Sequence, residues 1–381
     1  MKTVMLKVII LSFIGINFVL AASYEYPAIY KDTRIMGMGG ANVAVGGEAS
    51  SIFYNPAGLM QMEESEGIEI DLFNLTFAFS GNFFDFLKVL QDNQTLIDTD
   101  LSAFITAMNP YRSSNYHLAF NDYSSVSYRG SDYAWSVGYL VGADLNAIPH
   151  LSLGADGLIE MHLKTTSALI GGFAYEFNDE LMLGLGLKTF SGFNKASTIN
   201  VISASSIPST LDELNDYSTS AVDLGLTYIA DDLWPFDSFA DLEPTLGLSV
   251  LNIGGLDMGD FYASIPSTVN IGISIRPELP FFEDWVFAFD YIDLFNTYSS
   301  SAGLDSDPSK HIRVGTRASV FNNSFVEFTG SLGSYNSAVT YGVEARLAIF
   351  NIFFSSYVEE IGAYSGQNAD RRYQLSLAVG W

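Results

Sequence analysis

The residues with the best spacing for phosphate chemistry lie in a glycine-rich stretch, MGMGGANVAVGGEASSIFYNPAGL, at residues 36–59. A P-loop requires a lysine and then serine or threonine directly after its last glycine, and a dinucleotide fingerprint requires glycine where Asn42 stands. Neither pattern is complete, so the stretch predicts tight turns and close packing of backbone rather than a nucleotide site. Its glycines are Gly37, Gly39, Gly40, Gly46 and Gly47.

Four histidines are the remaining candidates for catalysis, namely His117, His150, His162 and His311. They are far apart, without metal-ligand spacing or a Ser-His-Asp order. Acidic pairs such as Asp98 with Asp100 and Asp305 with Asp307 are explained better by solvated loops than by Ca²⁺ binding. The chain has no cysteine, which excludes thiolate chemistry, disulfides and lipoprotein attachment. We therefore expect no enzyme activity, no cofactor and no metal site.

The composition favours a protein of many strands. The 381 residues include 33 Gly, 21 Tyr and 29 Phe, and only 16% are charged. Such a composition is typical of strands with aromatic girdles. The chain has 17 basic and 43 acidic residues, a net charge of −26, which argues against nucleic-acid binding because that function requires a positive surface.

Residues 1–22, MKTVMLKVIILSFIGINFVLAA, predict a secretory signal peptide. Lys2 and Lys7 precede an apolar stretch, and Val19 and Ala21 fit the small-residue rule for cleavage. An uncleaved membrane anchor is the alternative, but the apolar stretch is shorter than a spanning helix requires. The mature protein is therefore expected to leave the cytoplasm.

Apolar and polar residues alternate in many later segments. In STVNIGISIR, at 267–276, Val269, Ile271 and Ile273 share one face and Asn270, Gly272 and Ser274 the other. A soluble β-sandwich also alternates, but its strands are typically shorter. We predict a transmembrane antiparallel β-barrel of about fourteen strands at residues 66–381. The strands are predicted near 66–79, 115–129, 132–146, 157–177, 181–193, 217–230, 244–257, 266–277, 284–296, 309–320, 324–333, 337–349, 352–364 and 370–381.

Short turns separate these segments at one rim, which we assign to the periplasm, and longer loops lie at the other. The loops near 80–114 and 194–216 carry helical patterns. The first contains a set of apolar residues that we interpret as a hydrophobic lid over the barrel, with simple packing onto neighbouring segments as the alternative. The set is Phe79, Phe83, Phe84, Phe86 and Leu87.

A group of charged residues falls on the faces assigned to the lumen, because an arginine in mid-bilayer costs about 2–4 kcal/mol. One explanation is a ladder of ion pairs that stiffens the wall and anchors a plug. The other is an excess of positive charge that guides the carboxylate of an amphiphilic substrate. The group is Arg276, Asp290, Arg313, Arg317, Glu327, Glu344 and Arg346.

The last strand ends in alternating apolar residues with an aromatic residue at the final position. This pattern resembles the C-terminal signal by which the outer-membrane assembly machinery recognises its barrels. Its residues are Tyr373, Leu375, Leu377, Val379 and Trp381.

The glycine-rich stretch resembles the N-terminal hatch of FadL-type outer-membrane proteins, where such a run leads to Asn-Pro-Ala before the first strand; here the motif is Asn55, Pro56 and Ala57. Segments 245–255 and 265–275 resemble the PorV-like and TraF-like branch. The resemblance implies a fourteen-strand barrel plugged by a hatch at residues 23–65. Classical members pass long-chain fatty acids through a pocket above the hatch and out sideways through a kink in the wall. This chain departs from them because its long helical loop follows the first strand.

We therefore predict a monomeric outer-membrane barrel for passive uptake of hydrophobic or amphiphilic small molecules of the long-chain fatty acid class. The alternative is a docking or structural barrel for secretion or conjugation partners that transports nothing. Expected partners are the hydrophobic substrate, outer-membrane lipid and lipopolysaccharide, the barrel assembly machinery and, for the alternative, a periplasmic protein.

Overall fold

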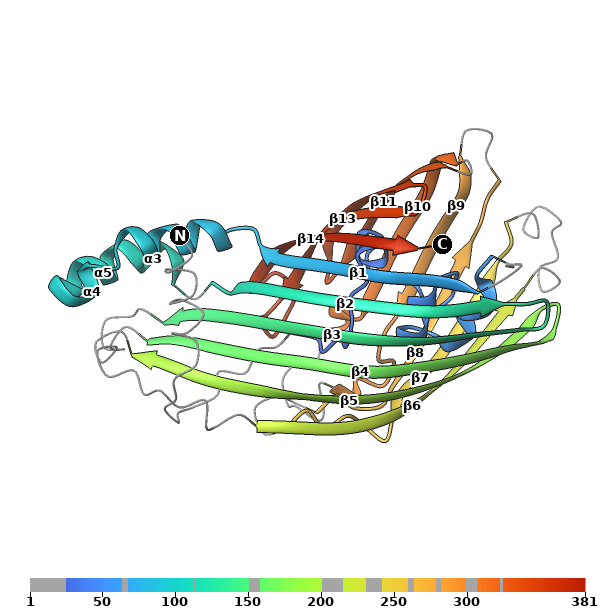
Figure 1. Ribbon diagram of the computed structural model, residues 1–381, viewed down its shortest axis with the longest axis horizontal. Helices are drawn as coiled ribbons and strands as arrows, with labels where there is room; N and C mark the ends of the chain where they lie inside the picture. Colours follow the sequence, from blue (N-terminus) through green and yellow to red (C-terminus); the bar gives the residue numbers. More distant parts are fainter. Residues whose placement is uncertain are drawn as a thin grey trace.

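Fourteen antiparallel strands close into one barrel in the computed structural model, with β1 paired to β14 (Figure 1). The fourteen-strand prediction is confirmed. The strands are β1 (Glu69–Ser80), β2 (Tyr116–Arg129), β3 (Tyr133–His150), β4 (Leu158–Asn178), β5 (Leu181–Asn200), β6 (Asn215–Ile229), β7 (Thr245–Ile253), β8 (Thr268–Ile275), β9 (Glu283–Tyr291), β10 (Ile312–Asn322), β11 (Val326–Tyr335), β12 (Ala338–Leu347), β13 (Phe350–Glu360) and β14 (Ala369–Gly380).

The structure describes residues 25–63, 68–112, 114–150, 158–200, 215–230, 242–259, 264–278, 282–298, 307–322 and 325–380. The predicted signal peptide, Asp305 and Trp381 lie outside these residues. Of the predicted loop at 194–216, residues 194–200 continue β5 and residues 201–214 lie outside the described part.

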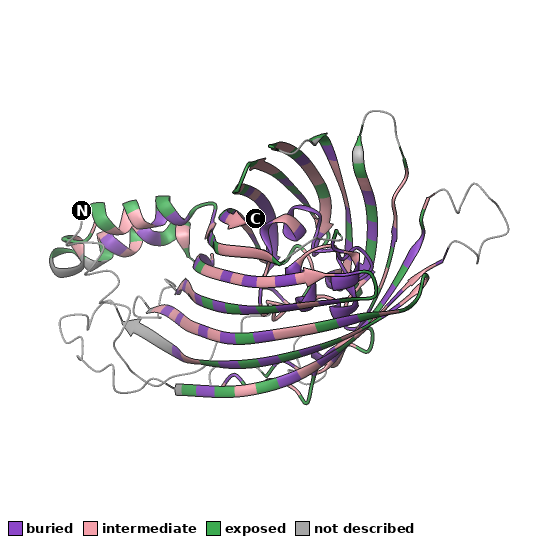
Figure 2. Cartoon of the chain, turned by 45° about the vertical axis from the view of Figure 1, so that its right-hand side comes forward, coloured by how far each residue is buried: buried purple, intermediate pink, exposed green. Residues whose placement is uncertain are grey.

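The strands form because side chains of alternating character point alternately outward and inward. On β12, Val339, Tyr341 and Val343 are outward and about half exposed, whereas Thr340 is fully buried inside. Burial alternates in the same way along most strands (Figure 2). The outer face of the barrel is therefore apolar, as a lipid-facing wall requires.

Among the described residues, no helix has the length and apolar character needed to cross a membrane.

The wall differs in height around the barrel. β3, β4 and β5 have 18 to 21 residues, but β7, β8 and β9 have only eight or nine. β6 pairs with β5 up to Asn215, yet its ladder with β7 ends at Val222. Within the described residues, residues 215–221 of β6 therefore pair with β5 but not with β7.

β7 and β9 end earlier than the sequence predicts, because the chain turns at residues with positive φ. At the end of β7 these are Asn252, within the strand, and Gly254, just after it, at φ 56° and 100°, and after β9 it is Asp293 at φ 53°. Beyond β7 the chain folds into the lumen, where Leu256 pairs with Ile265 and both side chains are buried.

The N-terminal residues 25–63 lie inside the barrel and are drawn in blue in Figure 1. They form three short helices, α2 (Thr33–Gly37), η1 (Ala49–Phe53) and η2 (Pro56–Gln61). We call this segment the hatch. It runs from the rim with the long loops, the loop end, to the rim with the short turns, the turn end.

The long segment after β1 contains α3 (Phe83–Asp92), α4 (Leu96–Thr99), α5 (Leu101–Met108) and η3 (Asn109–Tyr111). A further short helix, η6 (Pro308–Lys310), precedes β10.

Candidate functional site: a cavity between the hatch and the wall

The Asn-Pro-Ala motif anchors the hatch to β5 and β6 near the turn end. Asn55 caps η2 by accepting a hydrogen bond from the Ala57 amide at 3.1 Å, and Pro56 occupies the first position of the helix. The Asn55 side-chain amide donates to the carbonyls of Val43 (2.7 Å) and Leu226 (3.1 Å). The motif thus joins two turns of the hatch to the wall.

Glycines on the inner face of the wall let the hatch backbone approach it. A methyl group added at Gly184 or Gly225 would overlap Ala57 or Asn55, and one at Gly315 would overlap Met38. Within the hatch, Gly39 and Gly40 have φ of 71° and 77°, which favours glycine after α2. The glycine-rich motif therefore has partners in the wall.

Three of the predicted lumen charges hold the hatch. The Asp290 carboxylate accepts the amides of Asn42 (2.6 Å) and Val43 (2.8 Å). Arg276 donates to the Val45 carbonyl at 2.7 Å. Arg317 pairs with Glu48 at 2.9 Å, and Glu48 also pairs with Arg34 of α2 at 2.7 Å. These contacts fit the predicted role of anchoring a plug.

The other predicted charges have different surroundings. Arg346 pairs with Glu327 at 2.7 Å across β11 and β12, close to the turn end. Glu344 acts electrostatically on Arg34 and Arg317. Arg313 reaches the site described below.

A second ion cluster holds the first described residues of the hatch at the loop end. Glu25 binds Arg372 of β14 through both oxygens, at 3.0 and 2.9 Å, and Lys31 at 2.8 Å. Lys31 also pairs with Glu359 of β13 at 2.5 Å. Burial would raise the pKa of Glu25, but Arg372 and Lys31 outweigh it and hold that pKa well below the ordinary value of 4.5.

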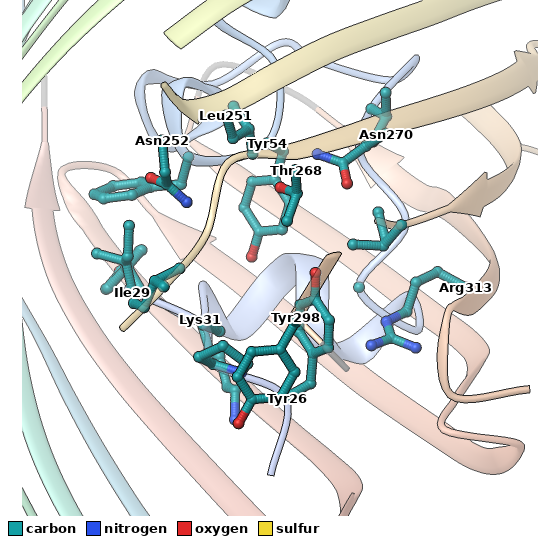
Figure 3. A pocket seen from close by; sticks show the side chains of 18 of the residues that line it. Tyr26, Ile29, Lys31, Tyr54, Leu251, Asn252, Thr268, Asn270, Tyr298 and Arg313 are labelled. Atoms are coloured by element: carbon teal, nitrogen blue, oxygen red, sulfur yellow. The ribbon is translucent and has the colours of Figure 1, made fainter. Parts of the chain in front are cut away.

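A cavity of about 100 Å³ lies between this part of the hatch and strands β7, β8 and β10 (Figure 3). The hatch contributes Tyr26, Ile29, Tyr30, Lys31, Phe53 and Tyr54, and the wall and its inward loops contribute Lys188, Leu251, Asn252, Ile265, Pro266, Thr268, Asn270, Tyr298 and Arg313.

The cavity adjoins the largest apolar cluster of the lumen. Tyr123, Leu140, Ile170 and Phe190 project inward from β2 to β5 and pack with Tyr30 and Phe53 of the hatch. All four wall side chains are at most 2% exposed. This side of the cavity is therefore mainly apolar, and its cation, Lys188 of β5, is paired with Asp223 at 2.6 Å.

The opposite side carries a buried cation. Arg313 is 3% exposed, and its guanidinium lies 3.8 Å from the centre of the Tyr335 ring. In the described part of the chain, the hydrogen bonds of this guanidinium go to the main-chain carbonyls of Lys310 (2.7 Å) and Ile312 (3.0 Å). Two further polar atoms at the cavity, the Tyr30 hydroxyl and Asn252 Oδ1, are buried and have no hydrogen-bond partner among the described residues.

Three of the four histidines have separate surroundings in the described part of the chain. His117 contacts Asn146, His162 contacts Glu160 and His311 contacts the Ile292 carbonyl, each at a different place. Among the described residues, no three His, Cys, Asp or Glu side chains are arranged to hold a metal ion.

The interpreted lid residues do not line the cavity. Phe83 and Phe86 are buried in a separate cluster with Phe104, Met108 and Tyr116, whereas Phe84 is 55% exposed. Sequence reasoning missed Tyr26, Ile29 and Tyr30, which line the cavity. Their only signal is the density of aromatic residues in YEYPAIY, directly after the predicted signal peptide.

The sequence matches no family model and no curated protein. Solved structures, however, match over almost their whole length. The Ralstonia pickettii toluene transporter TbuX has a TM-score of 0.54 at 13% identity, covering 95% of this chain and 99% of that one. The TodX deltaS2S3 mutant monoaromatic hydrocarbon channel has a TM-score of 0.53 at 12% identity, covering 94% and 99%.

This chain has the same barrel fold as these two solved channels. The closed fourteen-strand barrel is thus observed as predicted. The placement within the PorV-like and TraF-like branch stays a prediction.

The Glu25 cluster predicts that acid releases the start of the hatch. Because the folded pKa of Glu25 is depressed, its stabilising contribution is present above the ordinary pKa and is lost as the pH falls below it towards the folded value. A fluorophore on Ala28→Cys, the only thiol in the chain, is expected to be immobile at pH 7 and pH 5 and to become mobile only well below pH 4.5, as measured by fluorescence anisotropy.

Glu25→Gln in the same background is the control and is expected to be mobile already at pH 7. Equal anisotropy of parent and variant at pH 7 would contradict the assignment.

Proposed function

We propose that this protein is an outer-membrane channel for the passive uptake of small hydrophobic molecules. The observation that carries the proposal is the cavity on the loop side of the hatch, which has a mostly apolar lining and a low barrel wall beside it. Ligand sites in proteins are typically concave and mostly apolar, with a few polar groups that orient the ligand.

The arrangement supports a sideways route. A molecule at the cavity has the hatch on its turn side, where Asn55 and Asp290 hold the backbone against the wall. It has tall strands β3 to β5 on one side and the short strands β7 to β9 on the other. We therefore propose that the substrate leaves through the wall on the loop side of β7–β9, towards the lipid, without displacing the hatch.

The solved neighbours support the substrate class. One is named a toluene transporter and another a monoaromatic hydrocarbon channel. A cavity of about 100 Å³ is on the scale of one that holds a benzene ring, about 150 Å³. A long-chain fatty acid, the class favoured by the sequence, is larger than this cavity. We propose that it would enter only if residues 26–31, which line the cavity, moved away. We therefore propose single-ring compounds as the first substrates to test.

The docking alternative stays a prediction with its own support. The hatch is closed by buried ion pairs where it meets β10, β13 and β14, as a sealed barrel requires. The apolar cavity at β7 and β8 is the feature that a docking barrel does not need.

Filling the cavity is expected to slow uptake. Ile265 is 6% exposed and lines the cavity, so Ile265→Trp should reduce toluene entry about tenfold, equivalent to about 1.4 kcal/mol in a binding step. Uptake of radiolabelled toluene is measured in cells that lack their own channels of this fold.

Ile271→Trp is the matched control, because Ile271 points outward and is 39% exposed. Equal uptake by both variants, at equal surface expression, would exclude the cavity from the route.

Arg313 is expected to select for carboxylates. Charge-assisted hydrogen bonds contribute about 1.5–3 kcal/mol, so Arg313→Gln should weaken benzoate binding about tenfold or more and leave toluene binding unchanged. Calorimetric titration of the purified protein measures both.

Arg317→Gln is the comparison, since Arg317 holds Glu48 of the hatch and does not line the cavity. It should not discriminate between the two ligands. If Arg313→Gln weakened toluene and benzoate binding equally, Arg313 would have only a structural role.

A further inference from the structure

The helices that follow β1 lie against the outside of the barrel. In Figure 1 they project from the loop ends of β1 and β2. The Phe86 ring of α3 stacks on Tyr116 at 3.9 Å, and the same cluster includes Ala147, with Ile159 and Met161 packed against it. These four residues occupy the outward positions of β2, β3 and β4, in register with exposed Phe120, Val141 and Leu169. The helices therefore pack on outward side chains at the loop ends of β2, β3 and β4.

A row of aromatic rings on the outer wall continues onto α3. Tyr341, Phe354, Tyr373 and Phe79 come from β12, β13, β14 and β1, and successive ring centres are 6.3, 6.2 and 5.9 Å apart. The next ring is Phe84 of α3, 5.2 Å from Phe79. Phe84 is 55% exposed although it is large and apolar.

The height of this row fits the outer boundary of a bilayer. Phe79 pairs with Leu118, and ten residues along β2 lies Tyr128, which contacts Tyr133 and Trp135 at the turn end. Ten residues span about 33 Å along a strand, or about 25 Å across the membrane at a tilt of about 40°, the height of the apolar band of such barrels. Aromatic girdles mark both boundaries of that band.

The exposed surface of α3 has two chemically different sides. With about 100° between successive residues, Asp85 and Asp92 share one side, and Phe84 lies about a quarter turn away, towards the half-buried Leu87. Lys88 and Gln91, both exposed, lie nearest to Phe84 around the helix. Phe84 is thus a large apolar side chain between long polar ones and beside an acidic side, an arrangement that suits a helix lying at a membrane interface.

We propose that α3 is seated in the outer-leaflet interface of the membrane, with Phe84 inserted among the lipid chains. Lipid contact removes the exposed apolar surface of Phe84 from water, which is otherwise unfavourable by about 25 cal/mol per Å². The long loop then holds the barrel at a fixed height instead of covering its mouth. This inference is independent of what the barrel transports.

Site-directed spin labelling tests the proposal, because the chain has no native cysteine. Labels on Phe84→Cys and, as the matched control, Asp85→Cys are compared in vesicles of phosphatidylethanolamine and phosphatidylglycerol. Relaxation by oxygen, which enters lipid, is compared with relaxation by a water-soluble nickel chelate. The label at 84 is expected to respond mainly to oxygen and the label at 85 mainly to nickel.

Two results would overturn the proposal. A nickel response at 84 equal to that at 85 would place the helix in water, and a label at 84 shielded from both reagents would place it against protein. Heat-modified migration in electrophoresis shows that each variant has folded, so neither result can arise from an unfolded barrel.

Discussion

The main constraint on this structure is that a stretch of irregular backbone has to be buried inside a closed barrel. Buried peptide groups without partners are costly, so the hatch requires acceptors and donors from the wall. Asp290 accepts two hatch amides, Arg276 binds one hatch carbonyl, and Asn55 joins the hatch to β6. The inward glycines of β5, β6 and β10 allow the close approach that these bonds need. These bonds fix the position of the hatch backbone against the wall, and the cavity is the space left beside it.

The contacts between hatch and wall differ chemically between the two sides of the lumen. Towards β10, β13 and β14 the hatch is held by ion pairs between nearly buried charges, such as Lys31 with Glu359. Breaking one such pair is costly, because it leaves an unpaired buried charge. Towards β2 to β5 the contacts are mainly apolar, as between Phe53 and Tyr123. A charge on that side is the Lys188 ammonium, which lies 5.6 Å from the centre of the Phe53 ring and is paired with Asp223. An apolar molecule loses little by contact with that second side, and the cavity opens on it.

Much of the barrel is predictable because strand alternation is a local property. Val339 and Tyr341 already alternate with Thr340 and Gly342 in the sequence, and the strand count follows. The ends of β7 and β9 coincide with positive φ at Asn252 and Asp293. Asn and Asp favour turns, but they are also found on the polar faces of barrel strands, so the residue type alone does not fix where each strand ends. Arg313 and Arg317 share a predicted face, yet one lines the cavity and the other holds Glu48. That difference depends on which hatch residue lies opposite, and no local pattern contains it.

The central claim is that substrate passes the hatch without moving it, and a reversible tether tests this most directly. The hydroxyls of Thr33 in α2 and Ser376 in β14 are in hydrogen-bond contact and buried, so the pair Thr33→Cys and Ser376→Cys offers a disulfide between hatch and wall in a chain without other cysteines. The account predicts equal toluene uptake by the oxidised and reduced forms of this variant. Uptake that is lost on oxidation and restored by a reductant would show that the hatch is a moving gate and would contradict the account.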